Sequence, residues 1–297
     1  MFELIYRYDP SRPTERQAPA NAVEACRRLE EGNNAFATLA TGPADGARIV
    51  YFDLEDIGIA TEGSVPKQRP FAVVLGCSDA RVPIELIFDR ACNEIFVVRV
   101  AGNVLGQEEL GSIDYAVENL GQSLKLIVVL GHSRCGAVTA AVDAFLRPSE
   151  YLGLLASHHV RAIVNSLFPP VRGAATALAA QWGEDVVHRP GYRAALIELA
   201  VAVNAGLKAM ILLHQFGDPA KDLRIVFGVY DLGSRRVNVP LASSAQGGSP
   251  TCLMDAPMNR ERFDQFAADV ARSPLISRLL EEDLAQRRRG AKEDRNG

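Results

Sequence analysis

The chain has 297 residues, of which 48% are hydrophobic and 23% charged, and its formal net charge is −4. This composition is that of an ordinary globular protein, with enough apolar residues for one large domain or two small ones. The slightly acidic balance excludes an overall basic field, so we expect no nucleic-acid partner. The basic run 287–289 lies in a tail that is also rich in Glu and Asp, which is typical of a solvated segment.

The cellular location is predicted from what the chain does not show. No N-terminal stretch has the basic start, apolar centre and small-residue cleavage site of a secretory signal. We see no apolar run near the roughly 18–20 residues that a spanning helix needs. The five cysteines are odd in number and scattered, which favours reduced thiols or metal ligands over a disulfide framework. We therefore expect a cytoplasmic protein with no membrane partner.

The first part of the chain shows one clear element. The N-terminal segment is rich in Pro and Arg and is expected to be irregular. Residues 20–37 carry Val23, Cys26 and Leu29 at helical spacing, which predicts a helix with Cys26 in the core. Residues 41–68 are punctuated by Gly and Pro and are expected to be mostly connecting.

A regular alternation of strands and helices begins near residue 70. Short continuous apolar runs, as in a strand covered on both faces, alternate with segments of helical periodicity. Such an alternation predicts an α/β fold with a mostly parallel central sheet flanked by helices. The predicted strands are 70–76, 94–100, 124–131 and 223–239, and the predicted helices are 83–89, 108–121, 135–146 and 193–216.

The second half of the chain completes this plan. Residues 147–192 contain several prolines among short helical patterns and are expected to be a helical excursion from the sheet. Residues 223–239 predict a strand, a turn and an antiparallel edge strand. We therefore predict a single α/β domain over residues 1–240, with an N-terminal helical arm, and a helical, polar extension over 241–297.

Two of the predicted strands end in residues that carry chemistry. Cys77, Asp79 and Arg81 follow the strand 70–76. His132 and Cys135 follow the strand 124–131, which ends in the same letters, VVLG. Carboxyl ends of parallel strands meet at the edge of a sheet where ligands bind, so we expect these residues to lie together. A lone cysteine at a strand end is usually a core residue, but the combination is much harder to explain by packing.

The residue types predict a zinc site. Two thiols and one imidazole, Cys77, Cys135 and His132, are a donor set that zinc prefers. Three protein ligands leave a fourth position open, which is typical of catalytic zinc. Arg81 can pair with Asp79 and keep it ionised as an acceptor for the proton of a zinc-bound water. Asp79 could instead fill the fourth position itself, and the sequence pattern leaves both alternatives open.

These motifs resemble those of a known family. "CSDARV" at 77–82 with "GHSRCGAV" at 131–138 is similar to the signatures Cys-x-Asp-x-Arg and His-x-x-Cys of the β-class carbonic anhydrases. The segments at 96–103, 111–121 and 228–239 resemble further parts of that family. The likeness covers roughly residues 20–240.

The resemblance implies an activity and a role for each motif residue. A member of this family hydrates carbon dioxide reversibly to bicarbonate and a proton, through zinc-bound hydroxide. It implies that Cys77, His132 and Cys135 bind Zn²⁺ and that Asp79 and Arg81 form a catalytic pair. The chain would then be an enzyme, a carbonic anhydrase of the lyase class.

The resemblance also implies a substrate pocket and an assembly. By position, Gln68, Phe96 and Tyr115 correspond to residues that line the pocket in the plant-like branch of the family. Gln68 would donate a hydrogen bond to the substrate, and the two aromatic rings would form a small apolar wall. The family implies a homodimer or a multiple of dimers, in which the N-terminal helix embraces a neighbour and pockets lie at the interface.

Two alternatives to carbonic anhydrase activity remain at this stage. The same fold and zinc site could act on another small heterocumulene, such as carbon disulfide or carbonyl sulfide. The chain could also be a non-catalytic, bicarbonate-sensing regulatory module that uses the segment after residue 240 to contact a partner.

Overall fold

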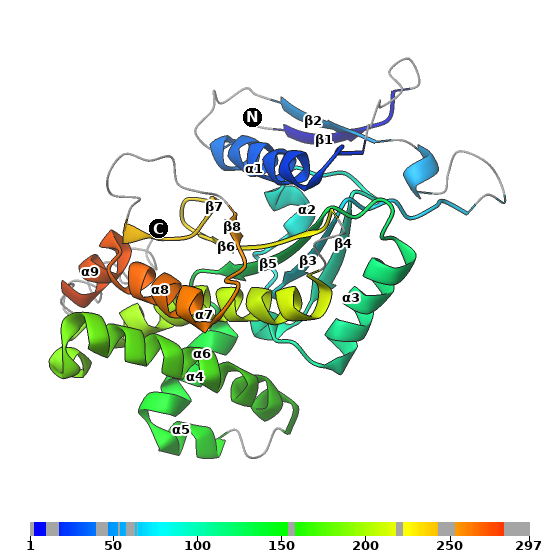
Figure 1. Cartoon of the computed structure of the whole chain (residues 1–297). Coiled ribbons are helices and arrows are strands. Elements are labelled where there is room, and N and C mark those ends of the chain that lie inside the picture. The colour runs from blue at the N-terminus through cyan, green and yellow to red at the C-terminus, as the bar shows by residue number, and fades with distance from the viewer. Residues whose placement is uncertain are drawn as a thin grey trace.

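The protein is described here by a computed structural model, which covers residues 3–9, 18–39, 47–52, 54–57, 63, 65–153, 158–217, 222–242 and 253–281. A six-stranded sheet forms its centre, in the order β4-β3-β5-β6-β7, with β8 also paired to β6 (Figure 1). The first four strands are parallel, and β7 and β8 run antiparallel to β6. This is the predicted α/β fold class. The strands are β3 (Ala72–Gly76), β4 (Ile95–Arg99), β5 (Leu126–His132), β6 (Arg224–Tyr230), β7 (Val237–Asn238) and β8 (Met254–Asp255).

Helices cover both faces of this sheet. Figure 1 shows α1 and α2 above the sheet and the long helices α4, α6 and α7 below it. The short helices η1 (Leu54–Ile57), η2 (Ala101–Asn103) and η3 (Glu184–His188) connect larger elements. The α-helices are α1 (Ala22–Thr38), α2 (Ile84–Ile87), α3 (Gln107–Asn119), α4 (Gly136–Leu146), α5 (Pro148–Gly153), α6 (His158–Trp182), α7 (Tyr192–Phe216), α8 (Arg260–Ala271) and α9 (Pro274–Glu281).

The central strands are apolar throughout because both of their faces are buried. In β3, Val73 and Leu75 lie in the core between the sheet and helices α4, α6 and α7. Ala72 and Val74 lie in the core on the other face, between the sheet and helices α1 and α2. All four side chains have no exposed surface. Burial of a Val or Leu side chain contributes about 1.5–3 kcal/mol, so the alternating faces hold the two helical layers to one sheet.

The register of β3 and β5 decides where the site lies. The two strands are parallel neighbours, and Gly76 pairs with Leu130. Cys77 and His132 therefore leave the sheet at the same edge. Adjacent ends for these two strands were expected from their matching sequences, and the structure confirms them.

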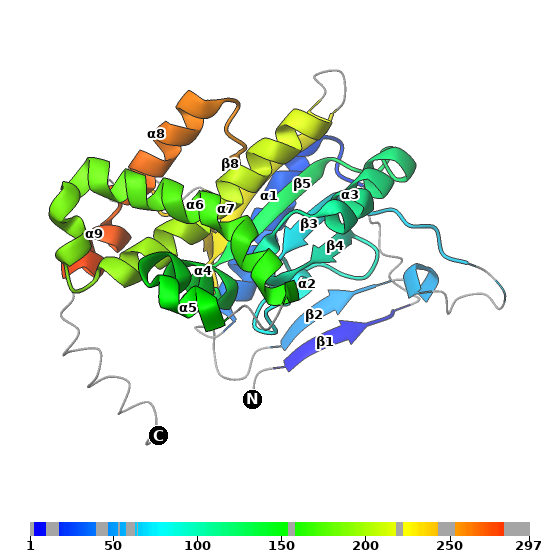
Figure 2. The ribbon, with the colours of Figure 1, turned by 90° about the horizontal axis from the view of Figure 1, so that it is seen from below.

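The N-terminal region differs from expectation. Strand β1 (Glu3–Arg7) pairs in parallel with β2 (Ala47–Tyr51), although both segments were predicted to lack regular structure. Figure 2 shows this two-stranded sheet apart from the central one. Val23, expected on the apolar face of α1, is 69% exposed, because the buried face of α1 runs through the neighbouring Ala22 and Ala25 instead.

Two helices also differ from the predictions. The excursion contains one helix of 25 residues, α6, which runs through Pro169 and Pro170 where shorter helices were expected. Helix α7 is long and apolar enough to cross a membrane by length and composition alone, although no apolar run near that length was expected. Most of it is buried between the sheet and α6, so here it is a core helix.

The segment after residue 240 contributes to the same core. Strand β8 pairs with β6, and Phe266 of α8 and Leu280 of α9 lie in the apolar cluster that includes α7. Residues 243–252 and 282–297 lie outside the described residues. The predicted division of the chain at residue 240 stays a prediction.

Candidate metal centre

Three potential metal ligands meet at the carboxyl edge of the sheet. The sulfur atoms of Cys77 and Cys135 and a ring nitrogen of His132 lie within 4.8 Å of one another, and all three residues are buried. Cys77 follows β3, His132 ends β5, and Cys135 is the N-cap of α4. Arg134 between them has a φ of 55°, in the left-handed region, and this tight turn brings Cys135 back towards His132.

The imidazole of His132 is oriented for coordination. Its Nδ1 donates a hydrogen bond to the carbonyl of Ser133 at 3.0 Å, so the lone pair resides on Nε2. Nε2 is fully buried and has no hydrogen-bond partner among the described residues. A buried acceptor without a partner is costly, and a metal ion at Nε2 would remove that cost.

The two thiols share one charge. The hydrogen bond from the Cys135 thiol lowers the pKa of Cys77, helped by hydrogen bonds from backbone N–H groups and opposed by burial. The same contact raises the pKa of Cys135, so its proton would be released only when a metal ion binds. Cys77 is therefore a ready thiolate, the form of cysteine that binds metal ions.

The spacing of the donor atoms fits zinc. Tetrahedral zinc, with bonds of about 2.0–2.3 Å, places donor atoms roughly 3.5–3.8 Å apart. The three donors here lie within 4.8 Å, so a small adjustment of side chains gives that geometry. Two thiolates and one imidazole also match the ligand preference of zinc.

Asp79 lies beside this cluster and is held by Arg81. Asp79 Oδ1 accepts hydrogen bonds from the backbone N–H and the Nε of Arg81, at 2.9 and 3.0 Å. Asp79 Oδ2 accepts one from Arg81 Nη2 at 2.7 Å and lies 3.9 Å from His132 Nε2. The Arg81 guanidinium holds the pKa of Asp79 well below its usual range, so the carboxylate is ionised at neutral pH.

Two residues that were not predicted to belong to the site hold the Cys77 segment in place. Arg99 at the end of β4 donates to the carbonyls of Cys77 and Asp79, at 3.0 and 2.6 Å. The backbone N–H of Gly102 donates to Cys77 Sγ at 3.3 Å. Both lie in the "FVVRVAGN" segment, so its likeness to the family was the available signal.

The end of β5 is fixed from the neighbouring strand. Ser133 Oγ donates to Asp231 Oδ1 at 3.0 Å and accepts a hydrogen bond from the N–H of Leu232 at 2.9 Å. The N–H of Ser133 also donates to the Tyr230 carbonyl at 2.9 Å. These contacts fix the backbone on which His132 lies.

The three predicted pocket residues lie before β3, on β4 and on α3. Phe96 pairs with Val73, four residues before Cys77, which is about 13 Å along the strand at roughly 3.3 Å per residue. Phe96 is half-buried on the edge strand β4, and Tyr115 on α3 is 48% exposed. Gln68 is also exposed. No hydrogen bond among the described residues joins any of the three to the cluster.

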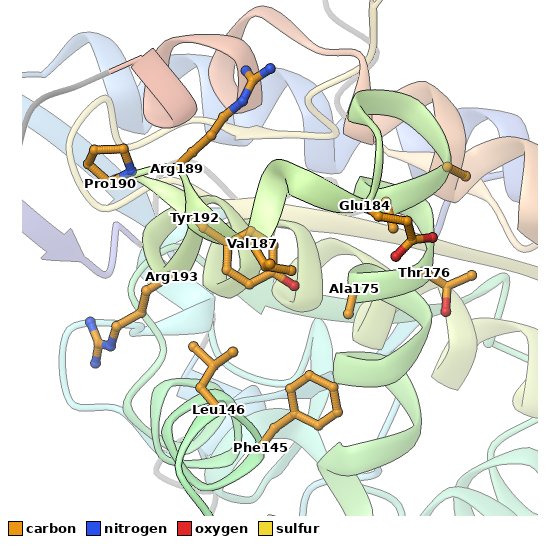
Figure 3. A pocket seen from close by; sticks show the side chains of 12 residues that line it. Phe145, Leu146, Ala175, Thr176, Glu184, Val187, Arg189, Pro190, Tyr192 and Arg193 are labelled. Carbon is orange, nitrogen blue, oxygen red and sulfur yellow. The ribbon is translucent and has the colours of Figure 1, made fainter.

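Two sizeable cavities lie away from the metal centre. One, of about 750 Å³, lies between the end of α4, helix α6 and the start of α7 (Figure 3). The other, of about 810 Å³, lies at the amino end of β6 beside α8. Neither is lined by Cys77, His132 or Cys135.

Comparison with known proteins agrees with the geometry of the site. Residues 72–232, more than half of the chain, match the carbonic anhydrase family. The chain belongs to the β-class carbonic anhydrases. The matched region begins at β3 and ends just after β6, so it includes every residue of the Cys-His-Cys cluster.

Relatives extend the comparison. The chain is 40% identical over 151 residues to carbonic anhydrase 2 of Mycobacterium tuberculosis. This alignment covers 51% of this chain and 65% of that protein, so the chain spans just under two thirds of the relative's length. A carbonic anhydrase of Mycolicibacterium smegmatis is 40% identical over 153 residues, 51% of this chain and 66% of that protein. A solved structure of a tetrameric β-carbonic anhydrase from Sordaria macrospora aligns at 21% identity and a TM-score of 0.45, covering 58% of this chain and 81% of that one.

Proposed function

We propose that this protein is a zinc-dependent carbonic anhydrase, which hydrates carbon dioxide reversibly to bicarbonate and a proton. The observation that carries the proposal is the cluster itself. The donor atoms of Cys77, His132 and Cys135 lie within 4.8 Å, and Nε2 of His132 is buried without a partner among the described residues. Zinc bound there would supply a Lewis acid that makes a water molecule acidic enough to lose a proton near neutral pH.

The remaining residues of the site orient and exclude water. Asp79, ionised beside Arg81, presents Oδ2 as a hydrogen-bond acceptor next to the cluster and orients the reacting water. Both carboxylate oxygens of Asp79 are held by Arg81, which favours the open site over one in which Asp79 is the fourth ligand. Buried surroundings keep other water away from the two sulfurs.

The pocket for the substrate is proposed to include a second copy of the chain. Within a single chain, Phe96 lies beside Val73, about 13 Å along β3 from Cys77, and Tyr115 faces outwards. A homodimer, or a multiple of dimers, would let Gln68, Phe96 and Tyr115 of one copy complete the pocket of its neighbour. Sedimentation velocity tests this proposal, which requires a mass of two or more chains.

We also propose a cytoplasmic location. Among the described residues, Cys26, Cys77 and Cys135 carry free thiols, which is the state that a reducing compartment maintains. The function proposed here also depends on that state, because a disulfide between Cys77 and Cys135 would remove both thiolate ligands.

The test compares Cys77→Ala with Cys26→Ala. Both residues are buried cysteines, but Cys26 lies on α1, away from the cluster. We expect about one zinc per chain in the wild type and in Cys26→Ala, with carbon dioxide hydration in stopped-flow assays. We expect Cys77→Ala to lose most of its zinc and its activity, since three ligands cannot be reduced to two without a large loss of affinity.

The same assay separates the alternatives. A zinc-replete wild type with no carbon dioxide hydration between pH 7 and 9 would refute the proposed activity. Release of sulfide from carbon disulfide in that case would assign the related heterocumulene substrate. Zinc retained in Cys77→Ala would refute the proposed ligand set.

A further inference from the structure

Helix α7 contacts the metal centre from beneath the sheet at several points along one face. Glu198 Oε1 accepts a hydrogen bond from the N–H of Arg134 at 3.0 Å, in the turn between His132 and Cys135. One turn later, Val201 packs so closely against Gly131 that a Cβ there would lie 3.2 Å from a Val201 methyl group. The helix therefore abuts the backbone on both sides of His132.

The third contact is made by a side chain unusual for this helix. Asn204 is 1% exposed, and its Nδ2 donates to the carbonyl of Gly102 at 2.9 Å. The N–H of the same Gly102 donates to Cys77 Sγ at 3.3 Å. Gly102 thus links the side-chain amide of Asn204 to the sulfur of Cys77, a proposed zinc ligand.

Gly102 can form this link because of its conformation. Its φ is +66°, in the left-handed region, and a Cβ there would lie 3.0 Å from Ala137 and 3.1 Å from Leu167. The backbone at this point is held by tight packing on α4 and α6 and by the hydrogen bond from Asn204. Removal of that bond would leave a buried carbonyl without its partner.

The position of Asn204 has an energetic cost. Residues 199–203 and Ala205 around it are buried and apolar, so an amide here is desolvated. Its Oδ1 has no partner among the described residues, although it is buried. Burying such a group without a full set of hydrogen bonds is unfavourable, because its interactions with water are not replaced. The amide orientation is fixed, because the opposite orientation would set Oδ1 against the Gly102 carbonyl.

We propose that Asn204 is a positioning residue for the metal centre, which holds Gly102 so that its N–H stays directed at the Cys77 sulfur. A hydrogen bond to a ligating thiolate fixes its orientation and withdraws electron density from the sulfur. Asn204 would thereby set both the zinc affinity and the donor strength of Cys77. The inference rests on the proposed function only in taking Cys77 as a zinc ligand.

The test uses two variants of Asn204 and a matched control. Asn204→Leu removes the donor and keeps the branching of the side chain, and Asn204→Asp replaces the donor by an acceptor of the same shape. The control is Asn33→Leu. Asn33 is also 1% exposed, and its amide makes hydrogen bonds to Ile87 O, Arg235 O and Val237 N, in the other apolar layer.

Each variant is measured in three ways. Competition with a chelator gives the zinc dissociation constant, and Co²⁺ substitution gives the thiolate-to-metal charge-transfer band. Urea unfolding gives the stability. We expect both Asn204 variants to bind zinc about 10–100-fold more weakly and to shift the cobalt band. Asn33→Leu should lose stability yet keep the wild-type affinity and band.

The outcomes distinguish this inference from the proposed function. Zinc affinity within about twofold of wild type and an unshifted cobalt band in both Asn204 variants would overturn the inference alone. The same changes in Asn33→Leu would also overturn it, since they would reflect general loosening. A wild type that binds no zinc would refute the proposed function instead. If Asn204→Leu does not fold, Asn204→Ser takes its place. The shorter serine side chain cannot reach the Gly102 carbonyl and adds no volume, and this variant is judged by the same criteria.

Discussion

Single residues at the metal centre either contact the cluster or orient a residue that does. Asp79 belongs to the first group and Arg81 to the second. Arg81 is 58% exposed, and its side-chain hydrogen bonds with described residues go to Asp79, whose two oxygens it holds in one orientation. Exposed ion pairs contribute little to stability, so the role of this pair is in geometry rather than in folding.

Arg81→Ala should therefore impair turnover more than zinc binding. Without Arg81 the pKa of Asp79 rises towards its ordinary value of about 3.9, and Asp79 remains ionised at pH 7. What is lost is the fixed orientation of the carboxylate, so we expect carbon dioxide hydration to fall about 10–100-fold at unchanged zinc content. Stopped-flow assays and metal analysis between pH 7 and 9 measure both.

The control for this variant is Arg27→Ala. Arg27 on α1 is 56% exposed and pairs with Glu31, so it is as accessible as Arg81 but distant from the site. Its loss should leave activity within about twofold of wild type. Zinc released from Arg81→Ala would contradict the orienting role and give Arg81 a structural one.

At the scale of elements, α7 is notable because it buries polar side chains in an otherwise apolar helix. It packs along β5, β6 and α6, and its middle residues are almost all buried. Besides Asn204 it buries Lys208, which is 6% exposed and has no ion pair with a described residue. Desolvation lowers the pKa of Lys208, which means that the fold disfavours its charged form.

Lys208→Met should consequently stabilise the protein. The unfolded chain binds the Lys208 proton more tightly than the fold does, so this residue costs stability at neutral pH. That cost shrinks as the pH rises from the lowered pKa towards 10.5. We expect a gain of roughly 1–2 kcal/mol at pH 7 and a smaller gain at pH 9.5, measured by urea unfolding.

Lys125→Met serves as the comparison for that variant. The Lys125 ammonium lies 3.5 Å from Asp222, so its removal breaks an ion pair and should bring no gain. Equal stabilisation by both variants would show that added apolar surface, and not relief of a buried charge, is responsible. A loss of stability in Lys208→Met would contradict the prediction outright.

The elements show what could be predicted from the sequence. Strands β3, β5 and β6 are continuous apolar runs covered on both faces, and this signal is local. Strands β1 and β2 were missed because they are short, carry polar residues and pair with each other across about 40 residues of the chain. Helix α6 was predicted as shorter pieces because proline disfavours a helix interior, whereas packing of the helix on α4 and α7 overrides that preference.

The site follows the same division. Cys77, His132 and Cys135 are recognisable because each belongs to a short motif at the carboxyl end of a strand. The contact of Asn204 with Gly102 spans 102 positions in the chain, and no local pattern encodes it. The available signal was a single Asn in the apolar run "LAVAVNAGL", which periodicity alone treats as an interruption.

At the scale of the whole molecule, the described C-terminal segment 253–281 closes the core on the α7 side. The Phe266 ring is 2% exposed and packs edge-on against Phe227 of β6, with ring centroids 5.0 Å apart. It also lies directly over Gly206 of α7, where a Cβ would come within 2.7 Å of the ring. Sheet, core helix and C-terminal segment therefore meet at one aromatic side chain.

Phe266→Ala should destabilise the whole chain in a single transition. The substitution removes a fully buried ring and leaves a cavity between β6 and α7, which costs about 3–5 kcal/mol. Met258→Ala is the control, because Met258 is 72% exposed and its loss should change stability by less than about 0.5 kcal/mol. Urea unfolding, followed by far-ultraviolet circular dichroism, measures both. A loss below about 1 kcal/mol, or a separate early transition, would mean that residues 253–281 fold independently of the sheet, because only an integrated segment transmits the cavity to the entire core.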